Sequence, residues 1–137
     1  MSFYKGFVPT VGKTPQMAFK DKSSSELLTL EEAQKFNEYA GVLADDAILV
    51  DIDTKNEADI MLKVVKSLGL KCRVLQSRKG AHFLFKIDRP LPNRTHIKLA
   101  IGLEADIKGC GKSSIEVLKI EGKEREVLYD IGDGEHY

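Results

Sequence analysis

The sequence predicts an α+β fold in which helices pack on a mixed β-sheet. An apolar run from Ala47 to Asp53 is typical of a buried strand. Residues 54–69 follow it with apolar side chains at helical spacing, which indicates an amphipathic helix. Leu70–Gln76 and Ala81–Ile87 are apolar runs joined by the turn sequence SRKG, which predicts a β-hairpin. A chain of 137 residues is long enough for one domain with one core.

The helix over residues 54–69 has recognisable ends. Thr54 and Glu57 form a capping-box pair at its start, and Gly69 ends it. The apolar face that should cover the sheet consists of Ala58, Met61, Leu62, Val65 and Leu68.

The remaining elements lie on either side of this central unit. Residues 1–28 are expected to be loop, because prolines, glycines and the run KDKSSSE interrupt them. Thr29 and Glu32 form a second capping box, which predicts a helix to about Ala40. After the break RPLPN we expect a short helix over Thr95–Ile101. Further strands are predicted over Leu103–Ile107, Ser114–Ile120 and Arg125–Tyr129.

Composition places the chain among soluble globular proteins, with 42% hydrophobic and 31% charged residues. Its two cysteines, Cys72 and Cys110, form no CxxC or His/Cys cluster, so no zinc site is indicated. The N-terminus lacks the apolar centre of a signal peptide, and no run approaches membrane-spanning length. We therefore expect a cytoplasmic protein with no membrane partner.

The net charge of zero conceals a basic middle segment. Residues 71–125 hold 13 Lys or Arg and 6 Asp or Glu, a net charge of +7. Such a segment can attract phosphate groups. Charge alone favours the simpler interpretation, in which these side chains only solvate the outer faces of strands and helices.

Two aspartates stand at the end of the first apolar strand. Asp51 and Asp53 point to the same side, because side chains alternate along a strand. Their repulsion is relieved by a shared proton, by basic neighbours or by a divalent cation, and solvation at a loop start remains the alternative. Asp106, in LEADIK, lies on another predicted strand. If the two strands are neighbours, three carboxylates meet, a set that suits magnesium or manganese.

His82 lies early on the second strand of the predicted hairpin. The preceding turn supplies Ser77, Arg78 and Lys79, and Gly80 lets a phosphate approach the backbone closely. A lone histidine on a strand is more often structural than functional. In this company it predicts a triphosphate-binding site with His82, Lys79 and Ser77 as donors.

These residues resemble the motifs of the archaeo-eukaryotic primase superfamily, in the primase-polymerase branch of phages and plasmids. LVDIDT, SRKGAHFLF and LEADIKG are similar, in order, to its DxD motif, its small-residue-x-His motif and its apolar-acid motif. The flanks FVPTVGKTPQMAFK and DIKGCGKSS…GKEREV resemble the same branch, so the likeness spans nearly the whole chain. One departure is that Gly80, not serine, stands two residues before His82.

The resemblance implies template-directed nucleotidyl transfer, by a DNA primase or polymerase of phage- or plasmid-type replication. Asp51, Asp53 and Asp106 would be the catalytic residues and would hold one or two Mg²⁺ or Mn²⁺ ions. The implied substrate-binding residues are Ser77, Lys79, His82 and Lys108. The residues expected to hold a template backbone are Lys108, Lys112, Lys119, Lys123 and Arg125.

The same resemblance implies partners and an architecture. Nucleoside triphosphates, single-stranded DNA template and primer would bind, with a helicase or other replication proteins as further partners. The fold would be a primase-like catalytic core that includes an RRM-like unit. Residues 1–137 would form one catalytic domain, on its own or as part of a longer replication protein.

Two alternatives remain open. The chain could be a replication fragment that binds nucleotide or DNA without independent catalysis. DIDTK also resembles the start of a haloacid-dehalogenase-type phosphatase, although that family's DxDGT has a glycine that is missing here. A Walker A motif is rejected, because GCGKSS lacks the full spacing and leads into a predicted strand rather than a helix.

Overall fold

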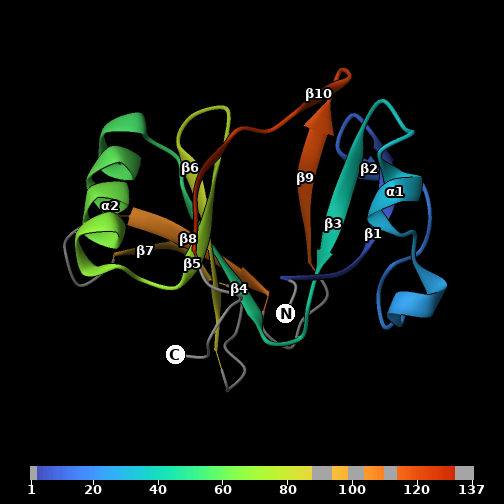
Figure 1. Ribbon diagram of the computed structural model, residues 1–137, viewed down its shortest axis with the longest axis horizontal. Coiled ribbons are helices and arrows are strands. Elements are labelled where there is room, and N and C mark those ends of the chain that lie inside the picture. Colours follow the sequence, from blue (N-terminus) through green and yellow to red (C-terminus); the bar gives the residue numbers. More distant parts are fainter. Residues whose placement is uncertain (1–2, 88–93, 99–103, 110–113, 132–137) are drawn as a thin grey trace.

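The computed structural model describes residues 3–87, 94–98, 104–109 and 114–131. Within these residues the strands form two sheets that face each other, with one helix outside each sheet (Figure 1). The helices are α2 (Lys55–Leu68) and α1 (Leu30–Ala33), and a 3₁₀ turn, η1, spans Ser24–Glu26. The α+β class is therefore confirmed, with strands far outnumbering helices in the described part of the chain.

The sheet beside α2, here called the β4 sheet, has the strand order β11-β5-β6-β4-β8-β7. Its strands are β4 (Ala47–Ile52), β5 (Cys72–Gln76), β6 (Ala81–Lys86), β7 (Arg94–Lys98), β8 (Glu104–Gly109) and β11 (Val127–Ile131). The opposite sheet, here called the β3 sheet, has the order β10-β9-β3-β1-β2. Its strands are β1 (Tyr4–Val11), β2 (Thr14–Pro15), β3 (Tyr39–Leu43), β9 (Ile115–Ile120) and β10 (Lys123–Glu124).

The prediction of one mixed sheet is wrong, because all pairings between the described strands are antiparallel. β4 and β5 run in the same direction on either side of α2. They do not pair with each other, because β6 lies between them and pairs antiparallel with both. The hairpin predicted from the SRKG turn is the β5–β6 pair, so that prediction is confirmed.

Helix α2 begins and ends where the sequence predicts. The Thr54 hydroxyl donates to Glu57 Oε1 at 3.1 Å, and Gly69 follows the helix with a φ of 62°, which favours glycine. Val65 is fully buried against the β4 sheet, but Leu68 is 67% exposed. Three residues turn a helix by about 300°. Leu68 therefore points about 60° away from Val65, at the margin of the apolar face.

The two faces of β4 contribute to different cores. Val50 and Ile52 pack with Phe83 in the cluster beneath α2. Leu49 packs with Leu84 in the cluster between the two sheets. This alternation is the one that the sequence predicts for a strand buried on both faces. The odd-numbered residues of β4 therefore face the β3 sheet.

The N-terminal segment is not the loop that we predicted for residues 1–28. Tyr4–Val11 forms strand β1, in which burial alternates residue by residue, and β2 pairs with it. Gly6 resembles a strand breaker in the sequence. In the fold it is required, because a Cβ there would lie 2.5 Å from Leu27 Cβ. Packing against distant residues, rather than local propensity, decides the structure of this segment.

The helix predicted from Thr29 to about Ala40 is shorter than expected. The capping box is confirmed, because Thr29 Oγ1 accepts from the Glu32 backbone N–H at 3.2 Å and Glu32 Oε1 accepts from the Thr29 backbone N–H at 3.1 Å. The helix nevertheless ends at Ala33, and Tyr39–Leu43 forms the central strand β3. All its residues are buried, and it pairs with β1 and β9. These pairings are remote in sequence, so a local pattern does not reveal them.

The helix predicted over Thr95–Ile101 is also wrong. Residues 94–98 form strand β7, which pairs with β8 at the edge of the β4 sheet, and residues 99–101 lie outside the described part. Hydrogen bonds to β8 replace those that a short helix would make within itself. The other predicted strands correspond to β8, β9 and β11, and β10 was not predicted.

Candidate functional site

Three carboxylates meet on the face of the β4 sheet that is turned toward the β3 sheet. Asp51 lies directly opposite Asp106 in the antiparallel pairing of β4 with β8, and Asp53 follows the end of β4. One oxygen from each of the three side chains lies within 4.8 Å of the others. The predicted convergence is therefore confirmed, and this cluster can hold a metal ion.

Asp51 is the most enclosed of these acids. Its Oδ1 is buried and accepts no hydrogen bond from the described residues, although His82 Nε2 lies 3.4 Å away. Burial raises the pKa of the Asp51 carboxyl group, but the nearby His82 ring and the Lys108 ammonium lower it more. The net pKa shift is downward, so Asp51 stays ionised at neutral pH. A buried anionic oxygen needs a nearby positive charge, and the His82 ring supplies one at 3.4 Å.

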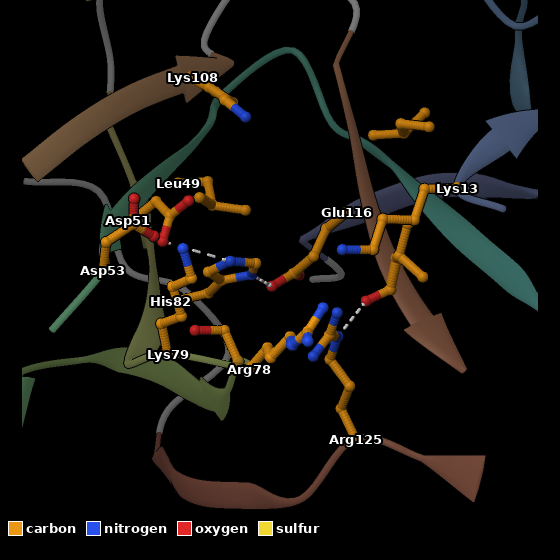
Figure 2. A pocket seen from close by; sticks show the side chains of 13 residues that line it. Lys13, Leu49, Asp51, Asp53, Arg78, Lys79, His82, Lys108, Glu116 and Arg125 are labelled. Carbon is orange, nitrogen blue, oxygen red and sulfur yellow. Dashed lines mark hydrogen bonds and ion pairs between the residues drawn. The ribbon is translucent and has the colours of Figure 1, made fainter. Parts of the chain in front are cut away.

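His82 lies on the other side of Asp51, because β6 pairs with β4 along its opposite edge. Its Nε2 faces Asp51, and its Nδ1 lies 2.7 Å from Glu116 Oε2 (Figure 2). Burial alone would lower the pKa of the imidazole, but its contacts with the two carboxylates raise that pKa to about 9. The ring is therefore positively charged at neutral pH.

Glu116 was not predicted as a site residue. It comes from β9 in the β3 sheet, its side chain is completely buried, and its Oε1 accepts a hydrogen bond from the Tyr4 hydroxyl. Burial, followed by the charge of Glu116, raises the pKa of Tyr4 well above its ordinary value. The sequence signal that could have identified Glu116 is an acid within the apolar strand SIEVLKI, on the same side as the buried Leu118.

The turn before His82 packs tightly against the end of β4. At Gly80 a Cβ would lie 1.9 Å from the Ile52 carbonyl oxygen, so only glycine fits. The Ser77 hydroxyl accepts from the Gly80 N–H at 3.2 Å and so stabilises the turn itself. The close contact with β4 therefore explains why glycine, rather than the serine expected from the resemblance, stands at position 80.

A cleft of about 410 Å³ lies between the two sheets at this point. The side chains of Asp51, Asp53, His82 and Glu116 line it, and all the predicted substrate-binding residues do as well (Figure 2). The basic residues along it are Lys13, Arg78, Lys79, Lys108 and Arg125. A cleft with carboxylates and this many cations suits an anion that is bound together with a metal ion.

Lys13 and Arg125 reach the cleft from the side of the β3 sheet. The Lys13 backbone N–H donates to Glu38 Oε2 at 2.6 Å, which fixes a turn in which Lys13 has a φ of 68°. Arg125 Nε donates to the Val117 carbonyl at 2.6 Å. Lys13 was not predicted, whereas Arg125 was expected along a template strand.

Two of the residues expected along a template do not line the cleft. Lys119 Nζ donates to the Gln34 carbonyl at 2.9 Å, and neither Lys119 nor Lys123 lines the cleft. Lys112 lies outside the described part of the chain. Of the four described residues in this set, Lys108 and Arg125 line the cleft.

Comparison of the chain with protein-family models, with curated proteins and with solved structures finds no match. Among the described residues, no helix has both the length and the apolar character needed to cross a bilayer.

Proposed function

We propose that this chain is a metal-dependent nucleotidyltransferase that extends a primer along a DNA template. The observation that carries the proposal is the convergence of Asp51, Asp53 and Asp106 beside a cleft with basic residues on both walls. Carboxylates alone occur on many surfaces. Their position beside cations suits a substrate that brings both phosphates and a divalent ion.

The three acids suit Mg²⁺ or Mn²⁺, which are hard cations that prefer carboxylate oxygens. The lowered pKa of Asp51, which keeps this carboxylate ionised, supports this assignment. When bound, such ions activate a 3′-hydroxyl and neutralise charge on the leaving pyrophosphate. The protein's own part is to fix the acids at the β4–β8 pairing, so that both strands support the site.

The basic residues along the cleft support binding of a triphosphate as part of this proposal. Lys79 and His82 come from the hairpin next to the acids, as the sequence predicts, and Ser77 shapes their turn. Lys13 and Arg125 approach from the opposite wall. Positive charge on two sides of a phosphate chain neutralises it and fixes its orientation, which is most of what phosphoryl transfer requires.

The topology of the β4 sheet is compatible with the implied core. Its central order β5-β6-β4-β8, with α2 between β4 and β5, is a split β-α-β arrangement with an added strand. An RRM-like unit has this kind of layout, which supports a primase-like assignment. Lys108 beside the acids would contact the template or primer backbone, and single-stranded DNA, a helicase or other replication proteins would be partners.

Primer extension by the full chain with Mn²⁺ tests the proposal. Asp51→Asn should lower the extension rate by at least about 100-fold, because one metal-ligand charge is lost while the shape is kept. Asp45→Asn is the matched control, because the Asp45 side chain is 89% exposed, forms an ion pair with Lys5 and does not line the cleft.

Each other outcome points to another function. Nucleotide binding without extension, under conditions that supply template and primer, would favour the binding-fragment alternative. A phosphorylated Asp51 after incubation with a phosphomonoester would favour the phosphatase alternative. Either result would overturn the nucleotidyltransferase assignment.

A further inference from the structure

We propose that Glu116 is a positioning residue, which holds the His82 ring so that Nε2 faces Asp51 and the cleft. The inference rests on the proposed function, in which His82 contacts the substrate's phosphates. Nothing in the sequence motifs points to Glu116, because it lies on β9, outside all three. The assignment comes from the contacts that the fold creates.

The contacts of Glu116 suit a residue that positions His82 rather than one that binds a metal ion. Its side chain has no exposed surface, and each of its oxygens already faces a protein donor. Oε1 accepts from the Tyr4 hydroxyl, and Oε2 lies 2.7 Å from His82 Nδ1. Asp51 differs, because its buried Oδ1 accepts no hydrogen bond from the described residues. The two carboxylates that flank His82 therefore have different roles.

The contact with Glu116 fixes the direction of the ring. The two nitrogens of an imidazole lie on different sides of the ring, so holding Nδ1 against Glu116 turns Nε2 toward Asp51 Oδ1, 3.4 Å away. A flip of the ring would place a carbon against Glu116 Oε2. The buried carboxylate would then lose one of its two donors, and such a loss is unfavourable.

The support for His82 extends across both sheets. Tyr4 comes from β1, Glu116 from β9 and His82 from β6, so the chain of contacts begins in the β3 sheet and ends at the acids of the β4 sheet. Figure 2 shows its last part, from Glu116 through His82 to Asp51. Tyr4 is itself held in place. Its ring occupies the space that a side chain at Gly41 would need, and the Arg73 guanidinium lies 5.6 Å from its centre.

The first test is a proton signal that does not depend on catalysis. In ¹⁵N-labelled protein, the His82 Nδ1–H should give a downfield resonance protected from exchange, because it donates to a buried carboxylate. Glu116→Ala should abolish this resonance. Glu116→Gln keeps an oxygen acceptor of the same shape and should retain it. Glu124→Gln is the matched control, because Glu124 accepts from the Tyr39 hydroxyl in the same sheet without contacting His82.

The second test separates nucleotide binding from the chemical step. Glu116→Ala should raise the KM for nucleotide about tenfold or more, the effect of one misplaced charged contact, and Glu116→Gln should restore most of the loss. Mn²⁺ affinity should stay close to wild type, because the three acids remain. If Glu116→Ala does not fold, Tyr4→Phe removes one support of Glu116 and should raise the same KM by a smaller factor.

Two results would overturn the inference. One is a His82 Nδ1–H resonance that is unchanged in Glu116→Ala, where no acceptor remains at this position. The other is an equal rise in the KM for nucleotide in Glu116→Ala, Glu116→Gln and Glu124→Gln, which would indicate a general loss of stability. Should the wild-type chain extend no primer, the proposed function fails, whereas the resonance still decides whether Glu116 orients the ring.

Discussion

Replacing Gly80 with alanine should distort the turn that carries Ser77, Arg78 and Lys79 along the cleft. The new Cβ would lie 1.9 Å from the Ile52 carbonyl oxygen and 3.1 Å from the Thr54 backbone nitrogen. Contacts under 3.0 Å essentially never occur for real Cβ atoms, so the turn and the end of β4 must separate by at least 1.1 Å. Both neighbours are backbone atoms and cannot rotate away.

The magnitude follows from this geometry. Overpacking a well-filled site costs about 1–3 kcal/mol, and the rigid backbone here favours the upper end of that range. Alanine also makes the unfolded chain less flexible than glycine does, which offsets about 0.4–1 kcal/mol of this loss. A net loss of about 2 kcal/mol in the free energy of unfolding is therefore expected. Because the end of β4 leads into Asp53, Mn²⁺ binding should weaken as well.

Urea denaturation and Mn²⁺ titration measure these two effects. Gly69→Ala is the control, because a Cβ there meets nothing within 4 Å and the only penalty is its φ of 62°, worth about 1 kcal/mol. A Gly80→Ala protein with wild-type stability and wild-type Mn²⁺ affinity would show that the turn is not held against β4 in this way.

Three further results are expected. Mn²⁺ at about 100 times its dissociation constant should stabilise the fold by about 2.7 kcal/mol, and Asp106→Asn should remove most of that gain in thermal melts. Without added metal, the free energy of unfolding should fall as pH rises from 7 through about 9, because the pKa of His82 in the folded protein is raised to about 9 and its charge is lost there. Denaturation curves measured across this pH range should show a smaller decrease for His82→Gln. Lys13→Ala should weaken nucleotide binding about tenfold in a direct titration, whereas Lys123→Ala, outside the cleft, should have no effect. Equal effects of the two lysine variants would contradict the assignment of the cleft.

The elements that the sequence predicts correctly have local signals. β4 follows from its apolar run, α2 from its spacing and end residues, and the β5–β6 hairpin from its turn. β1, β3 and β7 were missed or assigned as loop and helix. β1 pairs with β3, and β3 with β9, across long stretches of chain, whereas the pairings of β1 with β2 and of β7 with β8 are local. Strand propensity depends strongly on such partners, so the local sequence is a poor guide.

The same distinction between local and long-range signals applies to the residues of the candidate site. Asp51, Asp53, Asp106 and His82 were all predicted, because each stands at a recognisable position on a strand of the β4 sheet or, for Asp53, directly after one. Glu116 was not, because its contact with His82 exists only after the β3 sheet packs over the β4 sheet. The same is true of Lys13. Residues that reach a site from a second layer leave no spacing pattern for sequence reasoning to detect.

Neither sheet is a continuous piece of the chain. The β3 sheet takes its strands from residues 4–15, 39–43 and 115–124. The β4 sheet takes its strands from residues 47–52, 72–76, 81–86, 94–98 and 104–109, with a last edge strand at residues 127–131. A protein shortened to end at residue 109 would keep Asp51, Asp53 and Asp106. It would lack β9, so the edge of β3 that pairs with β9 would expose unpaired backbone N–H and C=O groups. A fragment cut to the shortest segment that contains the three acids should therefore aggregate. A fragment intended for functional study must extend at least to β11.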